Sequence, residues 1–460
     1  MREAMKQLRR ASKLTGLVEI RVDEIRDLYL EQLLRHPRSD VIITNRRTDE
    51  GGKFNGTAKE QFRILSKAVK HGAEYIDAEV SWGESFIAKL KSQHPKTPLI
   101  VSYHNFKETP VDLLSIYRKI RETRVDIVKI ATMSNDISDN KQMFNLLQTA
   151  HKDRQKTIAI CMGERGQVSR ILTGRYDGYL TFASMRTDQP TAPGQLTFEE
   201  LKSLFRTDTI NKRTKVFGLI GNPVAYSKGI DFHNRIFKRR SVNAAYVNFL
   251  VDDLPCFMKT FGREFSGYSV TMPYKEQIVP ILDNIDGEAS KLGIVNTVIN
   301  RKGKLVGLNT DLPALIAILK RRTPLRKKRV LVLGTGATSK TMAYAGMTSS
   351  ADVTIVGRSI TKAKALANEL NCQHDGLENI MNIPSDILMN GTSVGMVSKE
   401  SLVPKKYFRK GMVVLDAVYS STFTPLLLDA KAAGCNVVSG VELFERQAKL
   451  QSKMFLELMQ

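Results

Sequence analysis

Short apolar runs alternate with longer amphipathic stretches through the first half of the chain. The runs have the length and β-branched character of buried strands and occupy residues 17–22, 41–45, 74–80, 99–103, 126–131, 157–162 and 179–182. The stretches 58–71, 111–123 and 141–151 between them have the periodicity of amphipathic helices. Strands that alternate with helices need crossover connections, which produce a parallel sheet. Seven to eight such units in about 200 residues predict an α/β barrel.

Polar side chains stand at the ends of these predicted strands. In an α/β barrel the carboxyl ends of the strands meet at one mouth, where catalytic groups gather. Each polar residue alone could be a solvated loop residue or part of a structural ion pair, but contributions from several strands are a stronger indication of a site. The residues concerned are Glu19, Arg21, Arg46, Glu50, His104, Lys129, Arg170 and Gln195.

Lys129 is the most informative of these residues because it lies inside the β-branched run 125–132. Side chains alternate along a strand, so Lys129 shares a face with Ile127 and Ala131. Burial of a cation among such neighbours is costly, and loss of its proton would leave a neutral amine, which Schiff-base chemistry with a ketone requires. The alternative is a strand-end lysine whose ammonium group reaches water.

The second half of the chain restarts with a strand near Lys215, after the polar, unpatterned stretch 206–214. Farther on, R-V-L-V-L-G-T-G-A-T-S-K (329–340) runs from a strand through a glycine turn into a helix, and D-V-T-I-V-G-R-S (352–359) supplies the next strand. A glycine turn that opens a helix directs backbone N–H groups at a pyrophosphate. The motif is weak by itself, with Ser339 at the third glycine position, but its place between strand and helix strengthens it. Arg358 and Lys362 suit a 2′-phosphate, which favours NADP over NAD.

Composition narrows the class of protein. The chain of 460 residues should form two or three domains, and no apolar run approaches the length needed to cross a membrane. Four scattered cysteines without a C-x-x-C pair favour a reducing compartment and neither disulfides nor a metal site. The start of the chain has neither a secretory signal nor a transit peptide, so we expect a cytoplasmic protein, or a plastid one if a transit peptide has been lost.

The net charge of +23 raises the possibility of a polyanionic partner. The basic residues are spread along the chain, with one dense patch at 320–329 that could be a nuclear address or a nucleic-acid contact. A solvated loop is the favoured interpretation, since a proline interrupts the patch and no aromatic platform accompanies it. A non-catalytic nucleic-acid-binding protein is therefore an unfavoured alternative.

The first half resembles type I 3-dehydroquinate dehydratase over residues 16–206. The resemblance is carried by E-I-R-V-D, R-R-T-D-E-G-G, S-Y-H-N-F-K-E-T-P, D-I-V-K-I-A-T, M-G-E-R-G-Q-V-S-R and A-P-G-Q. It implies that Lys129 forms an imine with the substrate ketone, that His104 removes the adjacent proton and that Glu50 orients the histidine. Ligands of the substrate carboxylate and hydroxyls, or of the polar floor, would be Arg46, Arg170, Gln195, Glu19, Arg21 and Thr191, the last standing where the family usually has serine.

One departure concerns the closure of the barrel. The family begins with a strand before the helix that we expect here at residues 2–13, and this sequence has no such strand. The resemblance therefore predicts a (β/α)8-type barrel that lacks its first strand. Either the sequence is truncated, or the barrel is open and has two unpaired edges.

The second half resembles shikimate dehydrogenase over residues 215–450. The matches include G-Y-S-V-T-M-P-Y-K (267–275), G-L-N-T-D (307–311), N-G-T-S-V-G-M (390–396), D-A-V-Y (416–419) and G-V-E-L-F-E-R-Q-A (440–448). The resemblance implies that Lys275 and Asp311 form the catalytic pair. The implied substrate ligands are Ser227, Thr271, Asn296, Tyr419 and Gln447. The cofactor positions are Gly334, Gly336, Ala337, Arg358, Ser359, Lys362, Asn390, Thr392 and Gly440.

The order of the two halves is that of the plant-type bifunctional enzyme of the shikimate pathway. We expect a barrel at 1–206, a substrate domain at 215–312 and a Rossmann-like NADP domain at 325–440, with a terminal helix at 441–460 that packs back on the substrate domain. The expected substrates are 3-dehydroquinate and 3-dehydroshikimate or shikimate, and we favour a monomer without a membrane or nucleic-acid partner.

Three departures affect the reductase half. Gly229 replaces the second serine of the family's carboxylate clamp, which would weaken shikimate binding or admit quinate with its extra hydroxyl. Ala337 and Thr338 stand where the family has Gly-Ala, and Gly357 replaces an asparagine. A quinate-favouring dehydrogenase with a weak or inactive barrel is therefore the main alternative.

Overall fold

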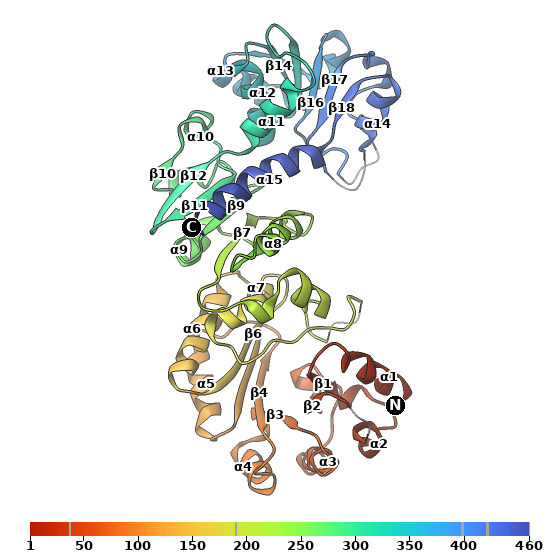
Figure 1. The fold of residues 1–460 in the computed structure, drawn as a ribbon, viewed down its shortest axis with the longest axis vertical. Helices are drawn as coiled ribbons and strands as arrows, with labels where there is room; N and C mark the ends of the chain where they lie inside the picture. Colours follow the sequence, from red (N-terminus) through yellow and green to blue (C-terminus); the bar gives the residue numbers. More distant parts are fainter. Residues whose placement is uncertain (36–37, 189–190, 397–399, 420–422, 460) are drawn as a thin grey trace. The chain divides into compact units, whose positions relative to one another are not determined.

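The structure is a computed structural model that describes residues 1–35, 38–188, 191–396, 400–419 and 423–459. Its contacts divide the chain into two compact units, Met1–Thr214 with Asn243–Asp252, and Lys215–Val242 with Asp253–Gln460 (Figure 1). No helix among the described residues is long and apolar enough to cross a membrane. All four cysteines are free.

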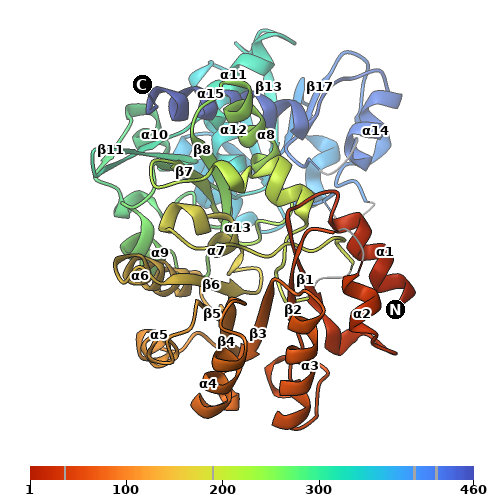
Figure 2. The same cartoon turned by 60° about the horizontal axis from the view of Figure 1, so that its bottom comes forward.

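The first sheet contains six parallel strands in the order β1-β2-β3-β4-β5-β6. Its strands are β1 (Leu17–Arg21), β2 (Asp40–Thr44), β3 (Tyr75–Glu79), β4 (Leu99–Asn105), β5 (Ile127–Met133) and β6 (Lys156–Met162). The helices are α1 (Arg2–Ala11), α2 (Leu30–Leu34), α3 (Ala58–Lys70), α4 (Glu84–Gln93), α5 (Leu113–Glu122), α6 (Asp139–Lys152) and α7 (Gln167–Ile171). Helix α3 contacts β2 and β3, α5 contacts β5, and α6 contacts β6 (Figure 2).

The sheet is open, so it forms part of a barrel, and β1 and β6 are its edges among the described residues. The prediction of a seventh strand at 179–182 is wrong, because this segment is not a strand. Tyr179 makes a single backbone hydrogen bond to the neighbouring strand, from its N–H to the Thr157 carbonyl at 2.8 Å. A strand needs pairing along its length, and the segment has no second neighbour in the described part of the sheet.

The inner face of this sheet carries a small apolar layer beneath the polar strand ends. It is formed by Ile42, Ile100, Ile127, Ile158 and Ile160, with Phe182 packed against it. The alternation of side chains places Lys129 on the same face as Ile127, one step closer to the carboxyl end of β5. The lysine therefore projects to the inside of the sheet, above the apolar layer.

Two further sheets form in the second half of the chain. The mixed sheet has the order β10-β12-β11-β9-β7-β8, with β9–β11 and β11–β12 antiparallel. Its strands are β7 (Lys215–Gly221), β8 (Ala244–Leu250), β9 (Gly267–Val270), β10 (Asn284–Ile285), β11 (Thr297–Arg301) and β12 (Lys304–Leu308). The helices α8 (Gly229–Arg239), α9 (Leu254–Phe261) and α10 (Gly287–Leu292) accompany it.

The third sheet is fully parallel, in the order β15-β14-β13-β16-β17-β18. Its strands are β13 (Arg329–Leu333), β14 (Asp352–Gly357), β15 (Gln373–Gly376), β16 (Ile387–Asn390), β17 (Val413–Asp416) and β18 (Asn436–Val438). Its helices are α11 (Asp311–Lys320), α12 (Ala337–Thr348), α13 (Ile360–Leu370) and α14 (Pro425–Ala432). Apolar clusters cover both faces, and the strand order reverses between β13 and β16, where α/β sheets bind dinucleotides.

The last helix, α15 (Gly440–Glu457), joins the mixed sheet to the parallel one. Gln451 donates to the carbonyl of Asn296 at 3.1 Å, and Ser452 bonds with His233 at 2.8 Å. In the basic patch, Arg322 pairs with Glu442 and Arg329 with Asp386, so part of its charge is matched by carboxylates of the chain.

Candidate active sites

One pocket at the carboxyl ends of the first sheet brings together every residue expected for the dehydratase. The expected residues that line it are Glu19, Arg21, Arg46, Glu50, His104, Lys129, Arg170, Thr191 and Gln195. They come from several strands and from the loops that follow them, as a barrel mouth requires.

The amine of Lys129 lies between two carboxylates. The residue is 6% exposed, and its Nζ donates to Glu19 Oε1 at 3.0 Å and to Asp77 Oδ2 at 2.9 Å. It also lies 4.4 Å from the centre of the Phe182 ring. The sequence argument expected a neutral amine in an apolar environment, and the structure instead places two carboxylates against this amine.

Asp77 and Glu79 are site residues that the sequence analysis missed. The buried guanidinium of Arg46 pairs with Asp77 at 3.0 Å and Glu79 at 3.1 Å, and it donates to Ser102 at 2.7 Å. Burial alone would raise the pKa of Asp77, but the Arg46 and Lys129 cations outweigh it and hold that pKa well below its usual range. The two acids occupy alternate positions of the apolar run 74–80, a period-two signal that could have revealed them.

His104 is held by Glu50. The Nδ1 atom of His104 lies 3.1 Å from Glu50 Oε2, while Ser81 donates to the other carboxylate oxygen at 2.7 Å. Burial, together with the Arg46 and Lys129 charges, holds the pKa of His104 well below its usual value, so the imidazole is neutral. Burial also raises the pKa of Glu50 to about 7.

Arg170 supplies a different kind of charge. It is buried, its Nε has no hydrogen-bond partner among the described residues, and burial lowers the pKa of its guanidinium to about 10. A buried cation of this kind is suited to an anionic ligand. On the rim, Gln195 Oε1 accepts hydrogen bonds from the backbone N–H of Thr191 at 2.8 Å and from its hydroxyl at 3.1 Å.

The expected reductase residues form a second group. Lys275 Nζ donates to Asp311 Oδ2 at 2.6 Å, where α11 begins. Tyr419 hydrogen-bonds with Ser227, and burial followed by the Asp311 charge raises the pKa of its phenol. These four side chains come from segments far apart in the sequence.

Asn296 and Gln447 converge on Thr310, next to this ion pair. Asn296 Oδ1 accepts from the Thr310 N–H at 2.8 Å, and the Thr310 hydroxyl lies 3.2 Å from Gln447 Oε1. Thr271 follows β9 and packs against Gly221, where an added Cβ would lie 2.4 Å from its methyl group. Two of the expected substrate positions therefore place amide groups at Thr310, the residue before Asp311.

The glycine turn fits a dinucleotide. Gly334 has φ +103°, and a Cβ there would lie 2.6 Å from Ser339 Oγ, so only glycine suits this turn. A Cβ on Gly336 would meet nothing within 4 Å, which leaves open space before α12. Helix α12 begins at Ala337 without a side-chain cap, so its first N–H groups are available to a phosphate.

The remaining cofactor positions lie near this turn. Ser359 caps α13, the exposed Arg358 follows β14, and the exposed Lys362 lies in the first turn of α13. Asn390 accepts hydrogen bonds from the N–H and hydroxyl of Thr392 at 3.0 and 2.7 Å. Ser339, at the third glycine position, is accommodated because Gly391 faces it, and a Cβ on Gly391 would lie 2.4 Å from Ser339 Oγ.

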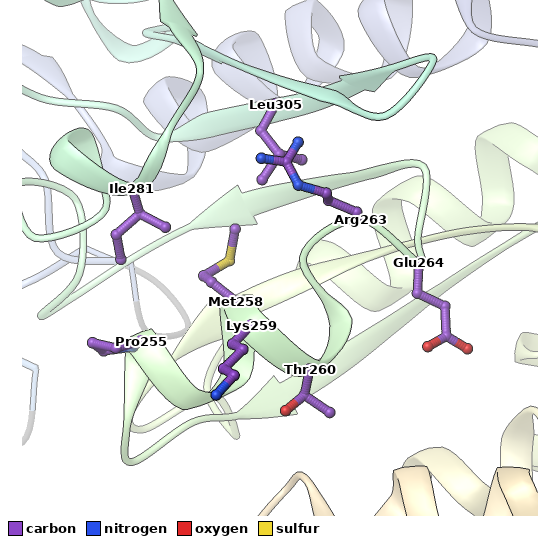
Figure 3. Close-up of a pocket in the computed structure, with 8 residues that line it drawn as sticks. All are labelled: Pro255, Met258, Lys259, Thr260, Arg263, Glu264, Ile281 and Leu305. Atoms are coloured by element: carbon purple, nitrogen blue, oxygen red, sulfur yellow. The ribbon is translucent and has the colours of Figure 1, made fainter.

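A cavity larger than the dehydratase pocket lies in the second half of the chain, and it belongs to neither the dehydratase nor the reductase residues. It has a volume of about 460 Å³ between α9 and the strands beside it, and Figure 3 shows the residues that line it. None of the expected site residues is among them, and Arg263 on its wall is already paired with Asp283. The size of a cavity is therefore a poor guide to the active sites here.

Three family models match successive parts of the chain. Residues 1–212 match type I 3-dehydroquinase, residues 219–298 the shikimate dehydrogenase substrate-binding domain, and residues 317–416 shikimate / quinate 5-dehydrogenase.

Individual relatives agree with these matches. A chloroplastic bifunctional 3-dehydroquinate dehydratase/shikimate dehydrogenase of Arabidopsis thaliana is 36% identical, over 96% of this chain and 78% of the relative. The NADP(+) shikimate dehydrogenase of Pyrococcus furiosus is 40% identical over 50% of this chain and 86% of its own length. The structure of shikimate 5-dehydrogenase from Thermus thermophilus with NADP(H) and shikimate superposes with a TM-score of 0.50, 30% identity and coverage of 54% of this chain and 95% of that one.

Proposed function

The chain belongs to the family of bifunctional 3-dehydroquinate dehydratase/shikimate dehydrogenases, and from this premise we propose which of its residues perform each reaction. It is an enzyme of the shikimate pathway that has a dehydratase part and an NADP-dependent reductase part. The observation that carries the proposal for the dehydratase is the buried Lys129 amine between Glu19 and Asp77, in the same pocket as a neutral His104.

The dehydratase residues can be assigned to successive proton movements. Lys129 passes a proton to one of the two neighbouring carboxylates, and its amine then adds to the C3 ketone. The adduct loses water and becomes an imine. The protonated imine acts as an electron sink, so neutral His104 can remove the proton at C2. The electron pair released at C2 forms an enamine, the C1 hydroxyl then leaves as water with the proton that His104 took up, and hydrolysis of the imine returns the Lys129 amine.

Two other groups hold the reactants in place. Ionised Glu50 would accept the Nδ1 proton of His104, which leaves Nε2 as the base. Arg170 is a buried cation whose Nε has no hydrogen-bond partner among the described residues, so it is suited to the substrate carboxylate. Arg46 also lines this pocket, and its bonds to Asp77 and Glu79 support a second role for it in fixing those two acids.

In the reductase, Lys275 and Asp311 would deliver a proton to the carbonyl oxygen. NADPH, when bound, supplies the hydride. Its pyrophosphate would be held at Gly334, Gly336 and Ala337, and its 2′-phosphate by Arg358, Ser359 and Lys362. Ser227 and Tyr419 would hold the acid substrate beside the ion pair.

One purified sample tests both assignments. We expect formation of 3-dehydroshikimate from 3-dehydroquinate, and oxidation of NADPH in preference to NADH when 3-dehydroshikimate is added. Salt-sensitive binding to random DNA together with absent turnover would contradict the proposal and favour the nucleic-acid alternative.

The acid preference of the reductase has a second candidate, quinate. Gly229 is the first residue of α8, and its N–H donates to Ser227 Oγ at 3.1 Å, so one hydroxyl stands where the family's clamp has two. The missing hydroxyl leaves room beside the substrate carboxylate for the extra C1 hydroxyl of quinate.

Replacement of this glycine tests the preference. In Gly229→Ser, the ratio of kcat/KM for quinate to that for shikimate should fall by about tenfold, because the added hydroxyl binds the carboxylate and fills the space. Gly287→Ser is a matched control, since it adds a serine at the start of α10 where a Cβ meets nothing within 4 Å. An unchanged ratio in Gly229→Ser would refute the quinate interpretation.

A further inference from the structure

Asp416 is a buried carboxylate that none of the steps above uses. It ends β17, is 0% exposed and accepts three hydrogen bonds from neutral groups. Its Oδ1 accepts from Asn390 Nδ2 at 2.9 Å and from the Val418 N–H at 3.0 Å, and its Oδ2 accepts from the Thr424 hydroxyl at 2.5 Å. A carboxylate is costly to bury, so three well-placed donors indicate that the position depends on its acceptor capacity.

The first partner leads to the cofactor turn. Asp416 accepts a hydrogen bond from the side-chain amide of Asn390 and so fixes its orientation. The Oδ1 atom of Asn390 then faces Thr392 and accepts hydrogen bonds from the backbone N–H and the hydroxyl of that residue. Thr392 in turn packs on the glycine turn, since its methyl group would lie 2.8 Å from a Cβ on Gly334. A change at the carboxylate would therefore be passed through one amide to the dinucleotide motif.

The second partner leads to the substrate residues. Val418 precedes Tyr419. The phenol of Tyr419 hydrogen-bonds with Ser227, and the nearby Asp311 charge contributes to its raised pKa. The carbonyl oxygens of Ala417 and Val418 also approach the start of α15 closely. A Cβ on Gly440 would lie 2.6 Å from the first oxygen and 2.5 Å from the second. The segment that carries Tyr419 is thus fixed on one side by Asp416 and on the other by Gly440.

We propose that Asp416 is a positioning residue of the reductase, which sets the distance between the cofactor turn at Asn390 and the substrate contact at Tyr419. It touches neither reactant and acts only through these two segments. Transfer between two bound molecules is sensitive to such placement, because a displacement of about 1 Å costs on the order of 100-fold in rate. The proposal rests on the reductase assignment made above.

Variants of the full chain test this role. Asp416→Ala should lower the reductase kcat by about 100-fold. The KM for NADPH should change by less than about fivefold, because Arg358 and the start of α12 stay intact. The isotope effect with NADPH deuterated at the transferred position should rise as that step becomes rate-limiting. Asp416→Asn should recover kcat to within about tenfold of the unaltered chain, since its amide keeps one acceptor and the Thr424 hydroxyl can rotate to accept. The dehydratase rate of each sample checks the amount of active protein.

A milder variant decides the matter if Asp416→Ala does not fold. Thr424→Val keeps the shape of the side chain but removes the donor to Asp416, together with the cap that the hydroxyl provides to Leu427 N–H at the start of α14. It should lower kcat by about fivefold at an unchanged KM for NADPH. Thr354→Val, which removes a hydroxyl from β14 in the same lobe, should have no effect. A lower melting temperature with unchanged kcat and isotope effect would mean a purely structural role and overturn the proposal. Absent reduction by the unaltered chain would instead overturn the reductase assignment, and this role with it.

Discussion

The two active sites use charge in opposite ways. The dehydratase pocket holds Lys129 and Arg46 against three carboxylates on the strands of one sheet, of which Asp77 and Glu79 are buried and Glu19 is partly buried. The reductase site has one ion pair, Lys275–Asp311, surrounded by amides and hydroxyls from several loops and helices. One site is an electrostatic network on rigid strand ends, and the other is an assembly of neutral contacts around a single pair.

The difference follows from the chemistry that each site must perform. Imine formation, proton removal and loss of water require several groups that exchange protons in sequence, and strand ends hold such groups at fixed distances. Reduction needs one proton and close alignment of two bound molecules, which depends more on the position of loops than on stored charge. We therefore expect a single substitution to lower the rate most at Lys129, the residue of the charge network that forms the covalent bond with the substrate.

The largest effect should come from Lys129. Lys129→Ala should lower the dehydratase kcat by about 10⁵-fold or more, because no other amine can form the imine. The reductase rate of the same chain should not change. Borohydride with 3-dehydroquinate should trap an adduct on Lys129, detectable by mass spectrometry, and none in the variant. Lys156→Ala, at the exposed start of β6, is the matched control. An adduct that persists in Lys129→Ala would remove the lysine from the mechanism.

A smaller effect is expected at the reductase pair. Lys275→Ala should lower the reductase kcat by about 10³-fold, since proton delivery to the carbonyl oxygen is lost while the cofactor turn stays intact. The KM for NADPH should remain near its original value. Lys291→Ala breaks a similar but exposed pair with Glu288 and should be silent. Equal effects of the two substitutions would mean that Lys275 is only a structural partner of Asp311.

The pH dependence of the dehydratase rate should report the titration of Glu50. Its pKa is raised by burial to about 7, so it is protonated below that pH and ionised above it. Only the ionised form accepts the Nδ1 proton of His104, so kcat/KM should rise with pH through about 7 and level off. Glu50→Gln should remove this limb and lower the plateau by about 10- to 100-fold.

Ser81 provides a finer test of the same limb. Its hydroxyl bond lowers the pKa of Glu50, so Ser81→Ala should move the limb to higher pH. Ser92→Ala, which removes an exposed hydroxyl on α4, should leave it in place. A limb that stays fixed in Ser81→Ala would assign the titration to another group.

The contrast between the sites also explains what could be predicted from sequence. Polar residues at the ends of apolar runs predicted a shared pocket, and they line one pocket because strand alternation and parallel pairing bring those ends together. The pairing of Lys129 with Glu19 and Asp77 was not predicted, since these acids lie 110 and 52 residues away and become neighbours only through the sheet. The segment 179–182 has the composition of a strand but not the neighbours, and pairing rather than composition decides the outcome.

In the reductase, motifs identified the segments but not their contacts. The serine at position 339 weakened the glycine motif, yet Gly391, on a distant loop, supplies the missing space. Such compensation is invisible along the chain because it depends on the approach of β16 to α12. The links from Asp416 to Asn390 and Val418 were likewise not visible, since an Asp after an apolar run has no unique partner.

The smallest effect separates a glycine that serves packing from one that serves the cofactor. Gly391→Ala places a Cβ 2.4 Å from Ser339 Oγ and 2.8 Å from its backbone N, so we expect a loss of about 1–3 kcal/mol and a melting temperature lower by several degrees without cofactor. Adding Ser339→Gly should recover part of this loss, because the shortest overlap disappears while the backbone overlap stays. Gly336→Ala meets no atom within 4 Å, so its melting temperature should be unchanged while its KM for NADPH rises, because the methyl group occupies the space of the pyrophosphate. Calorimetry and initial rates on the three variants would contradict this division if Gly336→Ala were the one to lose stability.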